Sequence, residues 1–143
     1  MGKGMLNSDH HKKLRDLASA LVDQEKARVI VPPQQNGSGF WFGGGNLMED
    51  RDGTLYAVGR YRNHGDARTG VGGGERGLEL AIFAPQDRGA SSRKVVSFPK
   101  ADLNVGNCEV VSIEGSALHR TDNGVELFVS SEKTNIGYPE GLE

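Results

Sequence analysis

The first stretch of the chain shows a helical pattern of apolar positions. Between residues 8 and 27, apolar side chains recur at spacings of three and four, which places them on one face of a helix: Leu14, Leu17, Ala18, Leu21 and Val22. Ser8 or Asp9 can cap the first turn by accepting hydrogen bonds from free backbone N–H groups. The pattern therefore predicts a helix over 8–27, and we expect its apolar face to pack against the rest of the protein.

From residue 40 onward, short apolar runs separated by turn residues replace the helical pattern. The expected strands cover residues 45–49, 54–61, 78–84, 93–98, 110–120 and 125–131. Asp-Gly and Asn-Gly lie in the turns 50–53 and 121–124, and this turn chemistry is typical of hairpins. The polar segments 32–39 and 62–77 are expected to be loops. The chain is thus predicted to be all-β after its N-terminal helix.

Two of the expected hairpins resemble each other at a fixed offset. When residues 116–132 are laid over residues 45–61, a shift of 71 residues, Leu118 falls on Leu47 and Asn123-Gly124 falls on Asp52-Gly53. Four antiparallel strands per repeat are typical of a β-propeller blade. The alternative is two unrelated hairpins. We interpret the pattern as a partial β-propeller, with one four-stranded antiparallel blade and half of a second.

This interpretation divides the chain into two parts. Residues 1–39 form an N-terminal helix and linker, and residues 40–143 form an incomplete propeller domain. Blade one covers about 40–100 and the start of blade two about 105–143. Because a propeller closes with roughly four or more blades, we expect the remainder of the propeller chain to be a partner of this segment.

Composition narrows the classes of function. The chain has 143 residues, a size typical of one domain. Its net charge of −2 implies no broad attraction to nucleic acid or to an anionic membrane. No apolar run is long enough to span a bilayer, and the first residues lack the apolar core of a signal peptide. We therefore expect a cytoplasmic protein without nucleic-acid or membrane partners.

Short motifs carry a resemblance to a known family. Phe40-Trp41-Phe42-Gly43 would open the first blade and Ser112-Ile113-Glu114-Gly115 the second. These segments resemble the five-bladed propeller glycoside hydrolases, the family-43-like group and its relatives. The resemblance implies that Glu114 is a catalytic general acid. Gly43 stands where that family has an aspartate base, so the resemblance also implies that the second carboxylate comes from elsewhere.

Several polar and aromatic residues are candidates for holding a carbohydrate. The expected substrate-binding residues are Trp41, Asn46, Arg60, Arg62 and His64. Arg60 and Arg62 share strand parity, so both can point to one face and offer forked donors to hydroxyls or a carboxylate. Trp41 can stack on a sugar ring. The structural alternatives are a solvated strand end for the arginines and filling of the blade interface for Trp41.

Other chemistries lack the required pattern. The glycine-rich stretch 70–77 has no Gly-Lys-Ser/Thr ending, so it does not match a phosphate-binding loop. His10 and His11 lie on adjacent helix positions, and no metal-ligand spacing occurs. Cys108 has no neighbouring histidine and is expected to be structural. No cofactor or metal is therefore expected.

The sequence leaves three functions open. The first is the N-terminal part of a carbohydrate-active propeller enzyme that hydrolyses or transfers glycosidic bonds. The second is a propeller that binds a glycan or protein without chemistry, which the glycine at position 43 favours. The third is a sialidase-like propeller, since residues 50–56 look like the blade turns of that group. For the enzyme hypothesis, we expect this segment alone to be inactive.

Overall fold

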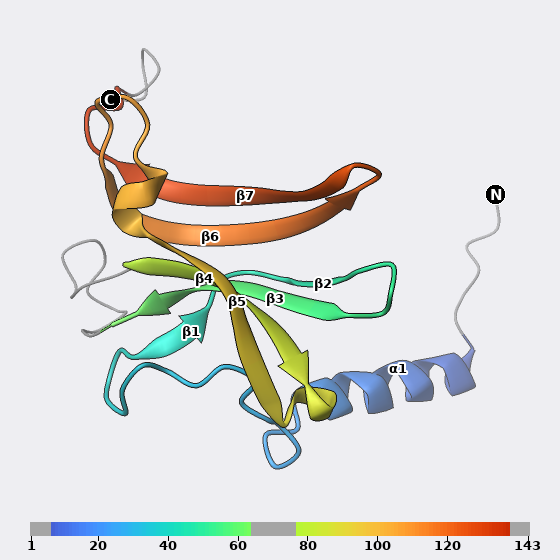
Figure 1. Ribbon diagram of the computed structural model, residues 1–143. Helices are drawn as coiled ribbons and strands as arrows, with labels where there is room; N and C mark the ends of the chain where they lie inside the picture. Colours follow the sequence, from blue (N-terminus) through green and yellow to red (C-terminus); the bar gives the residue numbers. More distant parts are fainter. Residues whose placement is uncertain (1–6, 64–76, 138–143) are drawn as a thin grey trace.

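The computed structural model describes residues 7–63 and 77–137 (Figure 1). The chain is mostly β, with one N-terminal helix and two open antiparallel sheets. The helix and strands are α1 Ser8–Leu21, β1 Trp41–Gly43, β2 Leu47–Glu49, β3 Leu55–Arg62, β4 Glu79–Gln86, β5 Ser91–Pro99, β6 Val110–Thr121 and β7 Gly124–Lys133. Short 3-10 turns lie at η2 Asp87–Gly89 and η3 Lys100–Leu103. The two predicted hairpins are confirmed as β2–β3 and β6–β7.

Helix α1 is shorter than predicted and begins with a different cap. The Asn7 side chain accepts a hydrogen bond from the His10 backbone N–H at 2.8 Å, so Asn7 and not Ser8 or Asp9 is the N-cap. The helix ends at Leu21 instead of residue 27. The Asp23 carboxylate accepts from the backbone of Glu25 at 3.2 Å. Such local side-chain bonds compete with helical ones, which explains the early end.

The apolar face of α1 is exposed, which contradicts the expectation that it packs against the sheets. Leu14, Leu17 and Leu21 are 52%, 57% and 76% exposed, and α1 contributes no buried residue. Ion pairs one turn apart, such as Lys12–Asp16 at 2.6 Å, support the helix from within. Among the described residues, no helix is long and apolar enough to cross a membrane.

The first sheet has four antiparallel rows. Strand β1 pairs with the C-terminal half of β3, where Trp41 lies opposite Arg62, and β2 pairs with the N-terminal half, where Met48 lies opposite Tyr56. Both occupy the same edge of β3, so together they form one interrupted strand. The order continues through β3 and β4 to β5. The second sheet is the β6–β7 hairpin, closed by a turn at Asp122 and Asn123.

Alternation along the strands gives the first sheet two apolar faces. Val58 on β3 and Leu80 on β4 face the β6–β7 hairpin and pack with its Ile113. Alternate residues of β3 and β4 point to the other face, where Tyr61 and Phe83 pack with β1 and the segment that precedes it. The residues of this second cluster are Ile30, Val31, Phe42, Tyr61, Ala81 and Phe83. Burial raises the pKa of the Tyr61 phenol. The first sheet is thus the middle layer of the protein.

Hydrogen bonds to the backbone of β6 join the two sheets. The Asn46 side chain donates to the Leu118 carbonyl at 3.1 Å and accepts from the Leu118 N–H at 2.8 Å. The Gly44 carbonyl accepts from Ser116 N–H at 2.9 Å, and the Gly77 carbonyl accepts from Ile113 N–H at 3.2 Å. We call these contacts the inter-sheet seam. They satisfy the outer edge of β6, which would otherwise leave backbone groups without partners.

Removing the Asn46 amide should therefore loosen the contact between the sheets. In Asn46→Ala, the backbone N–H and carbonyl of Leu118 lose both bonds, and each unsatisfied group costs about 1–3 kcal/mol. We therefore expect the free energy of unfolding, measured in urea, to fall by about 1–3 kcal/mol for each of the two groups. Asn36→Ala is the matched control, since Asn36 is exposed in the loop before β1. Equal stability of the two variants would contradict the role of Asn46.

Candidate functional site

A β-bulge in β6 presents Glu114 toward the first sheet. In the hairpin, Ile113 lies opposite Ser131 and Gly115 opposite Ser130, so Glu114 is the extra residue of a β-bulge. Bulges turn a side chain away from its regular direction and are frequent beside active sites. The bulge lies between Ile113 and Ser116, which the inter-sheet seam holds. The position of Glu114 is therefore fixed from both sides.

Arg60 forms an ion pair with Glu114. The Nη2 atom of Arg60 lies 3.7 Å from Oε2 of Glu114, and the two side chains are 14% and 38% exposed. Arg60 also donates to the Gly43 carbonyl at 3.5 Å. Arg60 comes from β3 and points to the same face as Val58, toward the hairpin. The pair places an ionised carboxylate beside a largely buried guanidinium.

Trp41 completes this group of side chains. The guanidinium carbon of Arg60 lies 4.9 Å from the centre of the Trp41 ring, a cation–π contact. The guanidinium therefore contacts both the indole and the carboxylate of Glu114. We call Trp41, Arg60 and Glu114 the charged cluster. Its members come from β1, β3 and β6, which are far apart in the sequence, and all three were predicted as site residues.

The glycine bend, residues 43–46, makes room for the cluster. Gly44 has φ +75°, and a Cβ there would lie 1.7 Å from Nη1 of Arg60. A Cβ on Gly45 would lie 1.9 Å from the Val58 carbonyl oxygen. Only glycine avoids these overlaps, and glycine also adopts the positive φ without strain. The bend explains why the first row of the sheet is interrupted between β1 and β2.

The other predicted binding residues have different environments. Arg62 is 7% exposed and lies opposite Trp41 in the β1–β3 register. The amide of Asn46 makes its two bonds to Leu118 in the inter-sheet seam, which gives it a structural role; contact with a sugar stays a prediction. His64 lies outside the described residues.

Sequence reasoning missed two serines on β6. The Oγ atoms of Ser112 and Ser116 are buried and have no hydrogen-bond partner within residues 7–63 and 77–137. Both flank Glu114 at a spacing of two, a parity that was visible in the sequence. The Oγ atom of Ser116 lies 3.0 Å from the position that a Cβ on Gly45 would take, so this hydroxyl faces the glycine bend.

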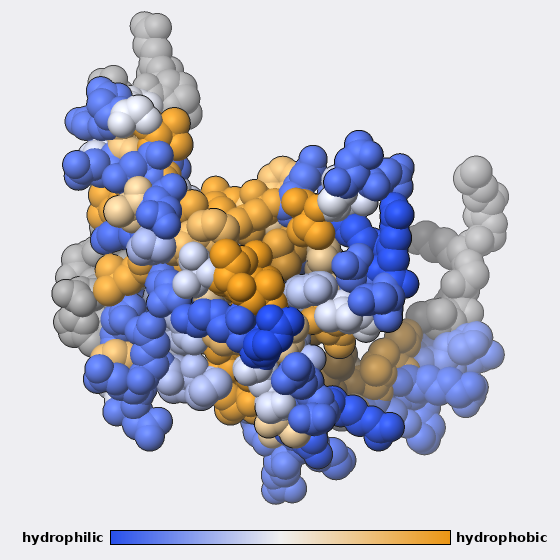
Figure 2. All heavy atoms as spheres, in the orientation of Figure 1, coloured by the Kyte–Doolittle hydropathy of each residue, from blue (hydrophilic) through white to orange (hydrophobic). Residues whose placement is uncertain are grey.

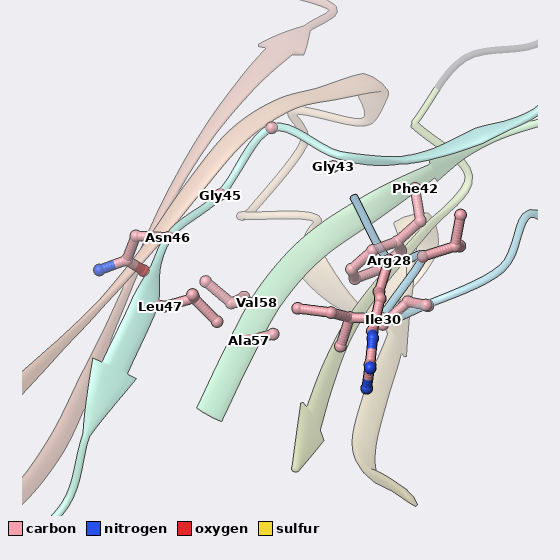
Figure 3. Close-up of a pocket in the computed structure, with 12 residues that line it drawn as sticks. Arg28, Ile30, Phe42, Gly43, Gly45, Asn46, Leu47, Ala57 and Val58 are labelled. Carbon is pink, nitrogen blue, oxygen red and sulfur yellow. The ribbon is translucent and has the colours of Figure 1, made fainter. Parts of the chain in front are cut away.

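A separate pocket lies at the glycine bend, lined by residues 28–31, 42–47 and 57–58. It has a volume of about 370 Å³. In Figure 3, Ile30, Leu47 and Val58 lie below the segment that carries Gly43 and Gly45. Its lining is mostly apolar, with Arg28 as the charged residue. Neither Trp41 nor Glu114 lines it, so the pocket and the charged cluster are distinct features.

No family model, curated protein or solved structure matches the chain. A function is therefore proposed from the geometry of the charged cluster.

The glycine bend offers a test of how the cluster is held. In Gly44→Ala, the new methyl group would occupy the position of the Arg60 guanidinium, so Arg60 should leave Trp41 and Glu114. We expect a lower unfolding midpoint and changed emission from Trp41, the single tryptophan.

The matched control is Gly106→Ala. Gly106 also has a positive φ, +60°, but nothing lies within 4 Å of the position that its new methyl group would take. Both variants carry the backbone cost of about 1–2 kcal/mol for a left-handed alanine, so the difference between them reports the contact with Arg60. If the two variants share the same midpoint and emission, the bend does not position Arg60.

Proposed function

We propose that this chain is the N-terminal part of a carbohydrate-active propeller enzyme that hydrolyses or transfers glycosidic bonds. The observation that carries the proposal is the charged cluster. It brings the single tryptophan, a largely buried arginine and a carboxylate on a β-bulge to one place. An aromatic ring can stack on a sugar and a forked donor can bond its hydroxyls. A carboxyl group is one of the pair that a glycosidase site requires.

The arrangement of the sheets supports a propeller. The first sheet is an antiparallel meander of four rows, as in a propeller blade. The β6–β7 hairpin packs on one of its faces through Val58, Leu80 and Ile113. In this proposal the hairpin is the first half of the second blade, and further blades come from the remainder of the chain.

The proposed chemistry assigns Glu114 as the acid that protonates the leaving oxygen. A sugar that stacks on Trp41 would take donors of Arg60 for its hydroxyls and would desolvate Glu114. In this role the Glu114 carboxyl group must carry a proton that it gives to the leaving oxygen. A second carboxylate is also needed, and in this proposal it comes from another blade, because position 43 is glycine.

A non-catalytic glycan-binding propeller is the second candidate. One observation favours it: position 43, where the resembled family has its aspartate base, is glycine. In this case Trp41 stacks on a sugar and the Arg60–Glu114 pair bonds its hydroxyls, without bond cleavage. The two candidates share a binding site and differ in turnover.

Titration of Trp41 fluorescence tests the shared part of both candidates. Soluble pentose and hexose oligosaccharides are added to the 143-residue chain. We expect a saturable change with at least one class of sugar, and a Kd at least about tenfold weaker in Arg60→Ala, because a charged hydrogen-bond donor contributes about 1.5–3 kcal/mol. Arg120→Ala, at an exposed position of β6, is the control. Absence of any saturable change would contradict both candidates.

Turnover separates the two candidates in a chain that carries the remaining blades. For an enzyme, Glu114→Gln should bind the sugar normally and lose turnover by about 10²–10⁴-fold. Substrates with activated leaving groups should be spared, because they need little protonation. Glu126→Gln, at an exposed position of β7, should turn over like the parent. Glycan binding without turnover in the parent would favour the binding module, and parental turnover in Glu114→Gln would refute the catalytic assignment.

A further inference from the structure

The two sheets differ in width, and this leaves part of one face uncovered. The first sheet has four rows, whereas the second has the two strands β6 and β7. Strand β6 packs over β2 and β3, so the outer rows β4 and β5 are only partly covered by the hairpin. Val95 and Val96 on β5 are 42% and 37% exposed. Figure 2 shows an apolar area at the centre of the view, over these outer strands.

A cavity marks the uncovered position next to β7. It has a volume of about 190 Å³ and lies between the two sheets. Ile82 of β4, Val95 of β5 and Val125 of β7 contribute to its lining, together with Met48, Asp50, Tyr56 and Leu118. The lining therefore connects the open edge of the hairpin with the outer rows of the first sheet. Its lining is mainly apolar, with Asp50 as the charged residue, which suits an apolar group.

Strand β7 presents a long edge beside this cavity. Within the described residues, β7 pairs with β6 along one side, and its other edge pairs with no strand. It runs over 10 residues without a proline. An unpaired edge of this length is a template for a further strand, and a two-stranded sheet by itself is only marginally stable. Adjacent strands lie about 4.8 Å apart, so the next strand would lie over β4 and β5.

We propose that the edge of β7 together with the 190 Å³ cavity is a docking site for one further β-strand with apolar side chains at alternate positions. The backbone of that strand would pair with β7, and its apolar side chains would cover Ile82 and Val95. The opposite face of β7 carries Glu126, so a basic residue on the solvent side of the incoming strand fits there. The proposal rests on the propeller arrangement, in which this strand is the third of the second blade.

A synthetic peptide tests the site in the 143-residue chain. The probe has the sequence Thr-Val-Lys-Val-Lys-Val-Thr, and a scrambled peptide places the valines together. We expect saturable binding of the alternating peptide, seen as NMR shift changes along β7 and at Val95, and at least tenfold weaker binding of the scrambled peptide. Equal binding of the two peptides, or no binding of either, would overturn the proposal.

Two variants show whether the edge itself binds the peptide. Val125→Lys places a charge on the cavity face of β7 at a position that is 49% exposed, and inward-pointing charges protect natural edges. It should weaken peptide binding at least tenfold with the unfolding midpoint nearly unchanged. Val105→Lys, at a loop position that is 66% exposed, is the control and should bind as the parent does.

Sedimentation of the free chain distinguishes a second copy as the occupant. A dimer that Val125→Lys converts to a monomer would show that β7 pairs with another copy of the chain, which overturns the proposal of a separate strand.

The peptide-binding measurement is also independent of the glycan titration. Failure of sugar binding with normal peptide binding would refute the carbohydrate function and retain the strand site, whereas the reverse result would refute the strand site.

Discussion

The inter-sheet seam is the constraint on which the rest of the structure depends. Asn46 uses both ends of its side-chain amide on Leu118, as a strand neighbour would use its backbone. The Gly44 and Gly77 carbonyls bond to β6 on either side of the bulge. Without these contacts, the β6–β7 hairpin would be held by apolar packing, which is not directional, and by the ion pairs Arg60–Glu114 and Arg51–Asp122. The seam therefore sets the register between the sheets.

The charged cluster follows from this register. Glu114 lies in the bulge between two seam contacts, and Arg60 reaches it from β3 at 3.7 Å. The glycine bend allows this approach because a side chain at Gly44 would overlap the guanidinium. One loop thus interrupts the first row of the sheet, contributes to the seam and leaves space for the site. Structure and proposed function share the same few residues.

Strands β2 to β7 were predictable from the sequence because their signals are local, whereas the short strand β1 Trp41–Gly43 was not predicted. Alternating apolar residues and the turns at Asp52-Gly53 and Asn123-Gly124 located both hairpins. The end of α1 was not predicted, since the Asp23 side chain bonds to the backbone of Glu25 in place of a helical bond. The exposure of the apolar face of α1 was not predicted either. Periodicity identifies a face and does not say whether anything covers it.

The residues of the charged cluster were predictable from the sequence, but their arrangement in space was not. Trp41, Arg60 and Glu114 were named from their chemical types and spacing, and the structure brings them together. The bulge that presents Glu114 depends on pairing with β7, so the sequence around Glu114 does not reveal it. The structural role of Asn46 depends on a partner 72 residues away. Long-range contacts of this kind have no local signal.

Amide hydrogen–deuterium exchange tests the seam most directly. The N–H groups of Ile113, Ser116 and Leu118 are the donors of the seam, so all three should exchange slowly in the parent. In Asn46→Ala, all three should exchange at least about tenfold faster, whereas amides in the β4–β5 ladder stay slow. If Leu118 exchanges at the same rate with and without the Asn46 amide, the sheets are not held by the seam, and the positioning of Glu114 needs another explanation.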